Sequence, residues 1–219
     1  MIEQFGQTIA EYVVGGGVFT YCVVIIFFTG VAITIERFKK LSFNYGVDGA
    51  SFMNELQRYI LSNDIAGAIR VCSGSNALLP KVLKNGLKRA GGSDEDIQGA
   101  LDATALEVIP KVEKYMNRLP ILANVSTLCG LLGTIQGLTH TFGALALADP
   151  EQKAKILSAG LAESMHTTFL GILTAIIILL MHAFLTGKSE KIISEIDEYS
   201  VKMLDMLRIR KNNKNGAAE

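Results

Sequence analysis

The sequence predicts an all-α integral membrane protein with three transmembrane helices, of which the second and third extend into long cytoplasmic helices. Three observations predict this class. The 219 residues are 49% hydrophobic and 19% charged, whereas about a quarter of a soluble domain is charged. The apolar residues gather in three blocks, each longer than the ~20 residues that cross a bilayer. No strand pattern or internal repeat competes with this interpretation.

The composition also argues against several functions. Lys+Arg and Asp+Glu are 21 each, so no net positive charge points to a nucleic-acid partner. Cys22, Cys72 and Cys129 are odd in number and far apart, which argues against a disulfide framework. We find no zinc-type spacing, no phosphate loop and no nucleophile beside a base. We therefore expect no metal, no cofactor, no catalytic residues and no enzyme activity.

The first predicted span covers residues 13–35, which carry no charge and would measure about 34 Å as a helix. A signal peptide would need a positively charged segment before it. Residues 1–12 contain Glu3 and Glu11 but no Lys or Arg. We therefore predict a retained transmembrane helix after a short outer segment.

The second span is predicted at residues 119–145 and the third at 160–185, joined by a short outer loop at 146–159. The second span is unusually polar, and its polar residues are Asn124, Ser126, Thr127, Thr134, Gln136, Thr139, His140 and Thr141. A helix of this kind faces protein or a wet cavity rather than lipid on all sides.

The distribution of basic residues predicts the topology. Residues 1–12 have no Lys or Arg, residues 36–118 have twelve, residues 146–159 have two and residues 186–219 have seven. By the positive-inside rule, the amino terminus lies outside, and the large loop and the tail are cytoplasmic.

The cytoplasmic regions carry helical signals. Ser93 followed by three acidic residues is typical of a helix start. From there an apolar period of 3.6 runs into the second span, and Pro110 and Pro120 are expected to kink it. The tail from 188 to about 210 is expected to continue the third span. Residues 48–90 are predicted to form shorter helices, with breaks at Gly74, Pro80 and the Gly91-Gly92 pair.

Small and polar residues form stripes on the second and third spans. In a hairpin centred near residue 151, Thr134 and Thr168 would lie at the same depth. The second span places Thr127, Gly130, Thr134, Gly137 and Thr141 on one face, and the third places Gly160, Ser164, Thr168, Gly171 and Ala175 on one face.

Two interpretations of these stripes are compatible. In the first, Gly130, Gly133, Gly137, Gly160 and Gly171 allow tight helix packing. In the second, Thr134 and Thr168, with Thr127, Thr141 and Ser164, line an ion pathway. Threonine does not titrate at accessible pH, so a pathway for protons would need a carboxylate from another chain at this level.

Glu163 is the one carboxylate inside the predicted spans. His140 lies 11 residues before the hairpin centre and Glu163 lies 12 after it, so the two could pair and join the ion pathway. Alternatively, Glu163 simply reaches the outer interface, where a carboxylate costs much less than at the bilayer centre. His166 lies slightly deeper and His182 near the inner end, and no spacing among these residues specifies a metal site.

Two motifs resemble those of the MotA/TolQ/ExbB proton-channel family, specifically its three-span ExbB/TolQ branch. The stretch from Gly130 to Gly137, GLLGTIQG, is similar to the G-L-h-G-T-V-x-G signature of that family. The stretch from Gly160 to Gly171, GLAESMHTTFLG, is similar to its G-I-A-E-A-L-x-x-T-x-x-G signature. Glu36-Arg37 matches the E-R pair that often follows the first span.

The resemblance implies a homopentamer in the bacterial cell inner membrane, with a periplasmic amino terminus and a cytoplasmic carboxy terminus. It implies a pore lined by the second and third spans and occupied by single-span ExbD/TolR-like partners. Each partner would bring a membrane aspartate that faces Thr134 and Thr168. Proton flow would then drive mechanical work, with a TonB/TolA-like protein as a further candidate partner.

The sequence departs from the family pattern at several positions. Gln136 stands where an aromatic residue is usual, Ala175-Ile176-Ile177 replaces an A-I-P triplet, and His140 and His166 are outside the signature. The alternatives are a non-conducting oligomeric scaffold and a sodium-driven or gliding-motor relative. The cargo (iron-complex uptake, outer-membrane maintenance, gliding or secretion) is not encoded in these motifs.

Overall fold

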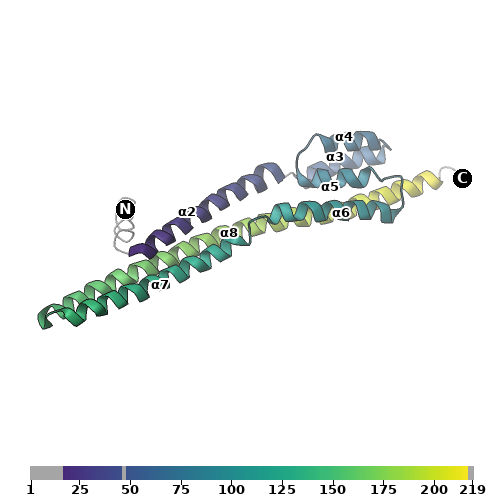
Figure 1. Ribbon diagram of the computed structural model, residues 1–219. Coiled ribbons are helices and arrows are strands. Elements are labelled where there is room, and N and C mark those ends of the chain that lie inside the picture. The colour runs from purple at the N-terminus through teal and green to yellow at the C-terminus, as the bar shows by residue number, and fades with distance from the viewer. Residues whose placement is uncertain (1–16, 46–47, 217–219) are drawn as a thin grey trace. The chain divides into compact units, whose positions relative to one another are not determined.

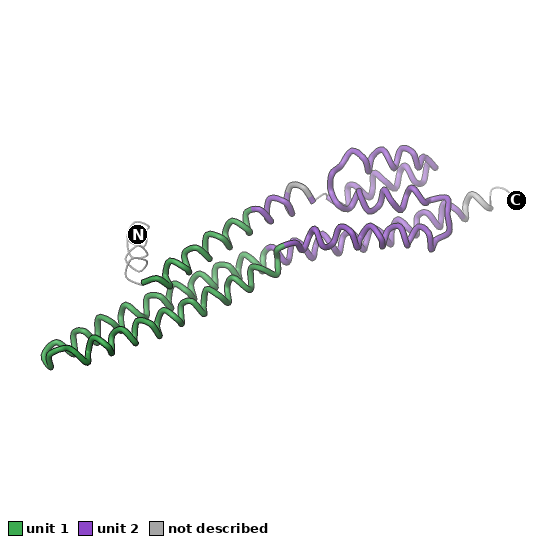
Figure 2. The backbone as a smooth tube through the Cα atoms, in the orientation of Figure 1, with its two compact units in different colours: residues 1–35, 115–184 green, residues 36–114, 185–219 purple. Residues whose placement is uncertain are grey.

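The computed structural model describes residues 17–45 and 48–216, and the chain divides into two compact units (Figure 2). Unit 1 consists of Met1–Ile35 and Tyr115–Phe184, and unit 2 of Glu36–Lys114 and Leu185–Glu219. Within the described ranges the regular elements are all helices, and three stretches are long and apolar enough to cross a membrane. The predicted fold class, an all-α membrane protein with three spans, is thus confirmed.

The first span forms helix α2, Gly17–Lys39, which continues into a short π-helix, η1, Lys40–Tyr45. Residues 13–16 of the predicted span lie outside the described residues. One face of α2 is buried in the structure, at Thr20, Val23, Gly30 and Arg37. These positions repeat at three and seven residues, which is the spacing of one helix face.

The second span forms α7, Arg118–Leu147, and the third span lies within α8, Pro150–Gly216. The tail continues the third span as one helix, as the sequence predicts. The connection is much shorter than the loop we expected at 146–159, because only Ala148 and Asp149 lie between the two helices. Proline is favoured at the first position of a helix, so Pro150 starts α8 and residues 150–159 are helical.

Helix α6, Asp94–Glu113, begins where the sequence predicts. The Ser93 side chain accepts from the backbone N–H of Asp96, and the Asp96 carboxylate accepts from the Ser93 backbone, which completes a capping box. The Ser93 hydroxyl and the Ser93 backbone N–H both donate to the Asp96 carboxylate, and these two hydrogen bonds hold the pKa of Asp96 below its usual value. The predicted capping signal is confirmed.

A turn at residues 114–117 separates α6 from α7, where we expected a kink. Pro110 lies inside α6 without ending it. Pro120 has no N–H, and in a continuous helix its ring would clash with the carbonyl four residues earlier, that of Met116, so it favours a break just before it. Tyr115 adopts a positive φ of 67° in the turn, and Pro120 then occupies the first turn of α7.

Unit 2 contains three further helices, α3 (Gly49–Leu61), α4 (Ile65–Ser73) and α5 (Leu78–Leu87) (Figure 1). Gly74 caps α4 as predicted, whereas Pro80 lies in the first turn of α5 rather than at a break. These helices pack on α6 and on the carboxy-terminal part of α8 around one core. Its fully buried members are Leu56, Ile60, Ala68, Val82, Leu83, Val108, Val112, Ile196 and Met203.

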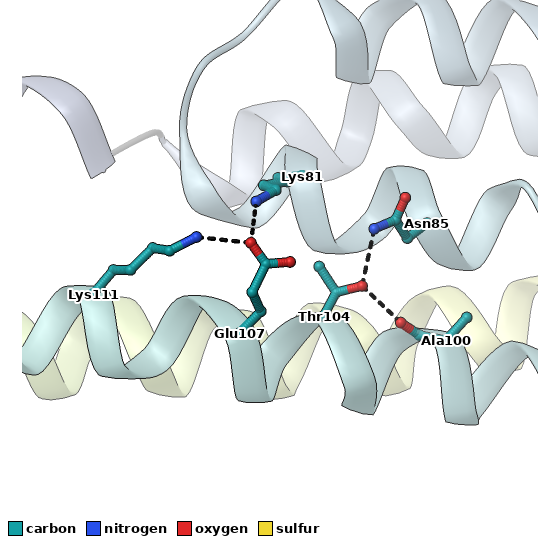
Figure 3. A network of polar contacts seen from close by, with 6 residues as sticks. All are labelled: Lys81, Asn85, Ala100, Thr104, Glu107 and Lys111. Atoms are coloured by element: carbon teal, nitrogen blue, oxygen red, sulfur yellow. Dashed lines mark hydrogen bonds and ion pairs between the residues drawn. The ribbon is translucent and has the colours of Figure 1, made fainter.

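Polar contacts join α5 to α6 at the surface of this core (Figure 3). The Glu107 carboxylate accepts from Lys81 at 2.8 Å and from Lys111 at 2.7 Å. The hydrogen bonds from Lys111 and Lys81 lower the pKa of Glu107 to about 2. Beside them, Asn85 donates to the Thr104 hydroxyl at 3.0 Å.

The end of α2 is tied to its neighbours in unit 2 by two cations. Arg37 is only 1% exposed, and its guanidinium donates to the Lys111 carbonyl oxygen at 3.3 Å. That carbonyl belongs to the last turn of α6, where helix carbonyls lack intrahelical partners and a positive charge is favoured. Lys188 donates to the Ser42 hydroxyl at 2.8 Å and lies 4.3 Å from the centre of the Phe38 ring.

Candidate functional site

Helices α7 and α8 of unit 1 meet along a seam of small residues, which we call the α7–α8 seam. It pairs Ser126 with Gly171, Gly130 with Thr168, Gly133 with Thr167, Gly137 with Ser164, and Thr141 with Gly160. The approach is close, because a Cβ added to Gly171 would lie 2.8 Å from the Ser126 carbonyl oxygen and 3.0 Å from the Gly130 Cα. Backbones approach this closely only where side chains are small.

The α7–α8 seam is crossed by hydrogen bonds from Thr168 and from Ser126 in the described part of the chain. The Thr168 hydroxyl donates to the Gly130 carbonyl oxygen at 3.0 Å, and the Ser126 hydroxyl donates to the Gly171 carbonyl oxygen at 3.1 Å. In an apolar environment each hydroxyl needs such a partner. The glycines therefore serve both the close approach and the exposure of carbonyl oxygens to the opposite helix.

The seam differs by one position from the stripes we expected. Gly130, Gly137 and Thr141 lie in it, but Ser126 and Gly133 take the places expected for Thr127 and Thr134. The five pairs place the hairpin centre about one to two residues before 151. Thr134 and Thr168 are thus offset by about two residues, roughly 3 Å along the helix axis.

Three of the four threonines predicted for the ion pathway, Thr127, Thr134 and Thr168, form one edge of the seam, which we call the threonine edge. Thr127 is exposed, and Thr134 and Thr168 are partly exposed. The Thr134 hydroxyl donates to the Leu131 carbonyl oxygen at 2.7 Å within its own helix. Thr127 donates in the same way to Ala123 at 3.2 Å. The Thr168 hydroxyl instead donates across the seam, to the Gly130 carbonyl oxygen.

On the other side of the seam a cavity of about 270 Å³ opens between the start of α2 and the helices α7 and α8. We call it the α2-side cavity, and it is lined by Gly17, Val18, Gly133, Gln136, Gly137, His140, Thr141, Glu163, Ser164 and Thr167. The cavity therefore contains His140, Glu163, Thr141 and Ser164 from our predicted site, together with Gln136.

Helix geometry places this cavity and the threonine edge on opposite sides of the seam. At about 100° per residue, Gly137 lies roughly 60° from Thr134 in one direction and roughly 60° from His140 in the other. On α8, Ser164 likewise lies between Glu163 and Thr168. The residues we predicted as one ion pathway thus divide into two groups, one on each side of the α7–α8 seam.

The expected pairing of His140 with Glu163 is not made by a direct contact among the described residues. Both side chains line the cavity, but no direct hydrogen bond or ion pair between them is present in the described part of the chain. A cavity of this volume has room for several water molecules, and its polar lining supplies the partners that ordered water needs.

One polar residue of this region was not predicted. Thr20 of α2 is fully buried, and its hydroxyl donates to the Thr167 hydroxyl at 3.5 Å. Farther along the same face, a Cβ on Gly30 would lie 2.9 Å from Ile178 Cδ1. The buried positions Thr20, Val23 and Gly30 follow one another at three and seven residues, a spacing that does not stand out within an apolar span.

No group of three or more His, Cys, Asp or Glu side chains that could hold a metal occurs among the residues the structure describes. The polar groups that line the α7–α8 seam and the α2-side cavity in the described chain are hydroxyls, the Gln136 amide, the His140 imidazole and the Glu163 carboxylate. Polar side chains of this kind, placed between membrane-spanning helices, can hydrogen-bond to water, to ions or to a partner's side chain.

These features define a class, a polytopic helical membrane protein with polar side chains between its spans, and comparison with known proteins defines it further. The model of the MotA/TolQ/ExbB proton channel family matches residues 74–198. This range is more than half of the chain and includes both motifs, so the chain belongs to this family. The family consists of channels that energise transport rather than of enzymes.

Individual relatives agree with the ExbB/TolQ branch. A Methanothermobacter thermautotrophicus protein, provisionally named biopolymer transport protein ExbB homolog, is 24% identical over 198 residues, 90% of this chain and 69% of the relative. A Synechocystis protein, provisionally named biopolymer transport protein ExbB-like 3, is 27% identical over 163 residues, 68% of this chain and 77% of the relative. The Tol-Pal system protein TolQ of Haemophilus influenzae is 34% identical over 83 residues, 36% of each chain.

Proposed function

We propose that the chain is the proton-conducting subunit of an ExbB/TolQ-like motor complex in the inner membrane of a bacterial cell. The motor couples proton motive force to mechanical work through a single-span partner of the ExbD/TolR type. The observation that carries this proposal is the threonine edge. Thr134 and Thr168 lie there at nearly equal depth, partly exposed, and the described parts of unit 1 place no carboxylate beside them.

Hydroxyls alone can orient a proton carrier but cannot act as one. Glu163 is turned to the opposite side of the α7–α8 seam, into the α2-side cavity. The carrier at the threonine edge is therefore an aspartate of the partner helix. The basic residues that flank the spans orient the amino terminus to the periplasm and the tail to the cytoplasm.

Exposed apolar residues outside the spans support a homo-oligomer, which by family resemblance is a pentamer. In unit 2, Leu106 is 75% exposed on α6 and Val201 is 61% exposed on α8. Exposed apolar residues mark a protein interface when they belong to a larger contiguous patch, and we propose that these two belong to one between protomers. Substituting either one with Glu is expected to shift the purified protein to smaller oligomers on size exclusion, whereas Glu at Leu147, in the outer turn region, is not.

The complex is tested first by capture. The chain, extracted from its native membrane in detergent, is expected to bring down a single-span protein with a membrane aspartate, and native mass spectrometry gives the stoichiometry. Repeated purification of a homo-oligomer without any such partner would overturn the motor assignment.

The threonine edge is tested by Thr134→Val, which is nearly isosteric. Thr134 donates only within its own helix, so the loss of its hydroxyl leaves the seam intact, whereas Thr168→Val would also remove a seam hydrogen bond. The matched control is Thr139→Val, because Thr139 makes the same bond to Ile135 at 2.8 Å and lies about 140° away from Thr134. Proton uptake by liposomes containing the complex is expected to fall in the first variant only.

The second candidate function is a non-conducting scaffold, which the α7–α8 seam itself favours. Small-residue packing requires no ion. A scaffold would tolerate Thr134→Val as well as Thr139→Val and would fail only when Gly130 or Gly171 is enlarged. Equal phenotypes of the two valine variants would therefore favour the scaffold over the motor.

A further inference from the structure

Unit 2 has a groove between α6 and the carboxy-terminal part of α8, which we call the α6–α8 groove. It has a volume of about 360 Å³, and its charged lining residues are Asp102, Asp197, Asp205 and Arg208. Arg208 already donates to Asp94 at 2.7 Å, whereas Asp102 and Asp197 form no ion pair in the described part of the chain. The groove therefore carries negative charge that its own lining does not neutralise.

Apolar side chains lie among these carboxylates. Leu204 and Val201 line the groove, and Val201 is 61% exposed. Leu106, one turn of α6 beyond Asp102, is 75% exposed. A groove with apolar residues and unpaired charge of one sign fits a helix face that carries the opposite charge.

Such a face is present on α5 of the same chain. Residues 78–90 contain four basic residues and no acidic residue. Lys81, Lys84 and Lys88 recur at three and four residues, so they share one face, which we call the basic stripe. Lys81 donates to Glu107, whereas Lys84 and Lys88 form no ion pair among the described residues.

The α6–α8 groove and the basic stripe lie on opposite sides of α6. Helix α5 contacts α6 through the hydrogen bond from Asn85 to Thr104 and the ion pair of Lys81 with Glu107 (Figure 3). At about 100° per residue, Asp102 lies roughly 160° from Thr104 around α6. A protomer therefore cannot place its own stripe in its own groove, but it can offer the groove to one neighbour and the stripe to another.

Resting on the homo-oligomer of the function proposed above, we propose that the α6–α8 groove of each protomer binds the basic stripe of the next copy of this chain. The lysine ammonium groups pair with Asp102 and Asp197, and their methylene stems cover Val201. The lengths agree, because Lys81 to Lys88 spans about 10 Å along a helix and Asp197 to Asp205 about 12 Å. A head-to-tail contact of this kind builds a closed ring when the rotation between copies allows it.

The test is a cross-link between copies of the full chain in its native membrane. Cys22 and Cys129 are replaced by alanine, and the remaining cysteine is buried. Val201→Cys then places a thiol in the groove, and Lys88→Cys places one on the stripe. A short bismaleimide is expected to join a Val201→Cys chain to a co-expressed Lys88→Cys chain, and to join chains that carry both changes into a ladder of oligomers. The matched control replaces Lys88→Cys with Arg58→Cys, at an exposed cation on α3, and should give no ladder.

Charge exchange tests whether the carboxylates and lysines make the contact. In the chain with both cysteines, Asp197→Lys or Lys84→Asp alone is expected to lower the cross-linking yield about fivefold, and the two together should restore most of it. Glu55→Lys reverses an exposed charge on α3, outside the groove, and should leave the yield unchanged. Far-ultraviolet circular dichroism of each variant shows that folded proteins are compared.

Equal ladders with Arg58→Cys and Lys88→Cys would overturn the inference, and so would a combined charge variant that cross-links no better than the single ones. An oligomer of normal size in which groove and stripe never cross-link would overturn it too, while the homo-oligomer of the proposed function would stand. If charge reversal in the groove stops capture of the single-span partner and leaves the cross-link unchanged, the groove belongs to that partner instead. The cross-link needs neither the partner nor proton flow, so failure of the motor assignment does not alter its result.

Discussion

Gly171→Ala adds one methyl group at the closest point of the α7–α8 seam. Its Cβ would lie 2.8 Å from the Ser126 carbonyl oxygen and 3.0 Å from the Gly130 Cα. Both neighbours are backbone atoms, so no side-chain rotation can make room. The two helices must therefore move apart by several tenths of an ångström.

The cost follows from three contributions. Inserting a methyl group into a well-packed contact costs about 1–3 kcal/mol. Separation of the helices stretches the two seam hydrogen bonds, each worth ~0.6 kcal/mol in a membrane protein. Replacing a helical glycine returns about 1 kcal/mol. We expect the free energy of unfolding to fall by about 1–3 kcal/mol.

The assay is reversible unfolding in mixed micelles by sodium dodecyl sulfate, followed by far-ultraviolet circular dichroism. The matched control is Gly143→Ala on α7, where an added Cβ meets nothing within 4 Å. That variant gains helix propensity without a clash and should be neutral or stabilised by up to about 1 kcal/mol. If the two variants unfold at the same detergent fraction, the seam is not a close backbone contact and the reasoning is refuted.

Three further predictions concern unit 2. The two lysine partners of Glu107 lower its pKa to about 2. The stabilisation from the ionised carboxylate is therefore complete above the ordinary glutamate pKa of about 4.3 and is lost as the pH falls towards 2. The thermal midpoints of Glu107→Gln and of the unaltered chain should differ at pH 6 and converge near pH 2. Burial raises the pKa of the Cys72 thiol to about 11. In a variant with Cys22 and Cys129 replaced by alanine, maleimide should therefore label Cys72 only when the protein unfolds. Rapid labelling of the folded protein would contradict this. Arg37→Leu removes the guanidinium bond to the end of α6 and should lower the free energy of unfolding by about 1.5–3 kcal/mol; Arg37→Lys should restore little of it, because Lys lacks the guanidinium fork.

Much of the architecture is predictable because it depends on local signals. Three apolar blocks define the spans, and Ser93 with its acidic neighbours defines the start of α6. The short connection at Ala148 and Asp149 was missed because the loop was placed by hydropathy alone. The Asp149-Pro150-Glu151 sequence is itself a helix-start signal, and a hydropathy profile does not detect such a signal.

The site was predicted only in part, for a geometric reason. A period of 3.6 residues identifies a small-residue face, but neighbours such as Gly133 and Thr134 are both compatible with it. Which of them enters the seam also depends on the first span, helix α2, because Thr20 of α2 contacts Thr167 of α8. The division of the polar residues into a threonine edge and a cavity is therefore a tertiary property that no single span encodes.

The two-residue connection between α7 and α8 also bears on how the protein is made. Of the three stretches able to cross a membrane, the one containing α7 is the least apolar, and its glutamine and histidine raise the cost of entering lipid alone. The connection is too short for α7 to stay at the membrane interface, apart from α8, while α8 is synthesised. We therefore expect the translocon to release the two helices together as a preformed hairpin, with the more apolar α8 carrying α7 into the bilayer and Asp149 at the leading tip.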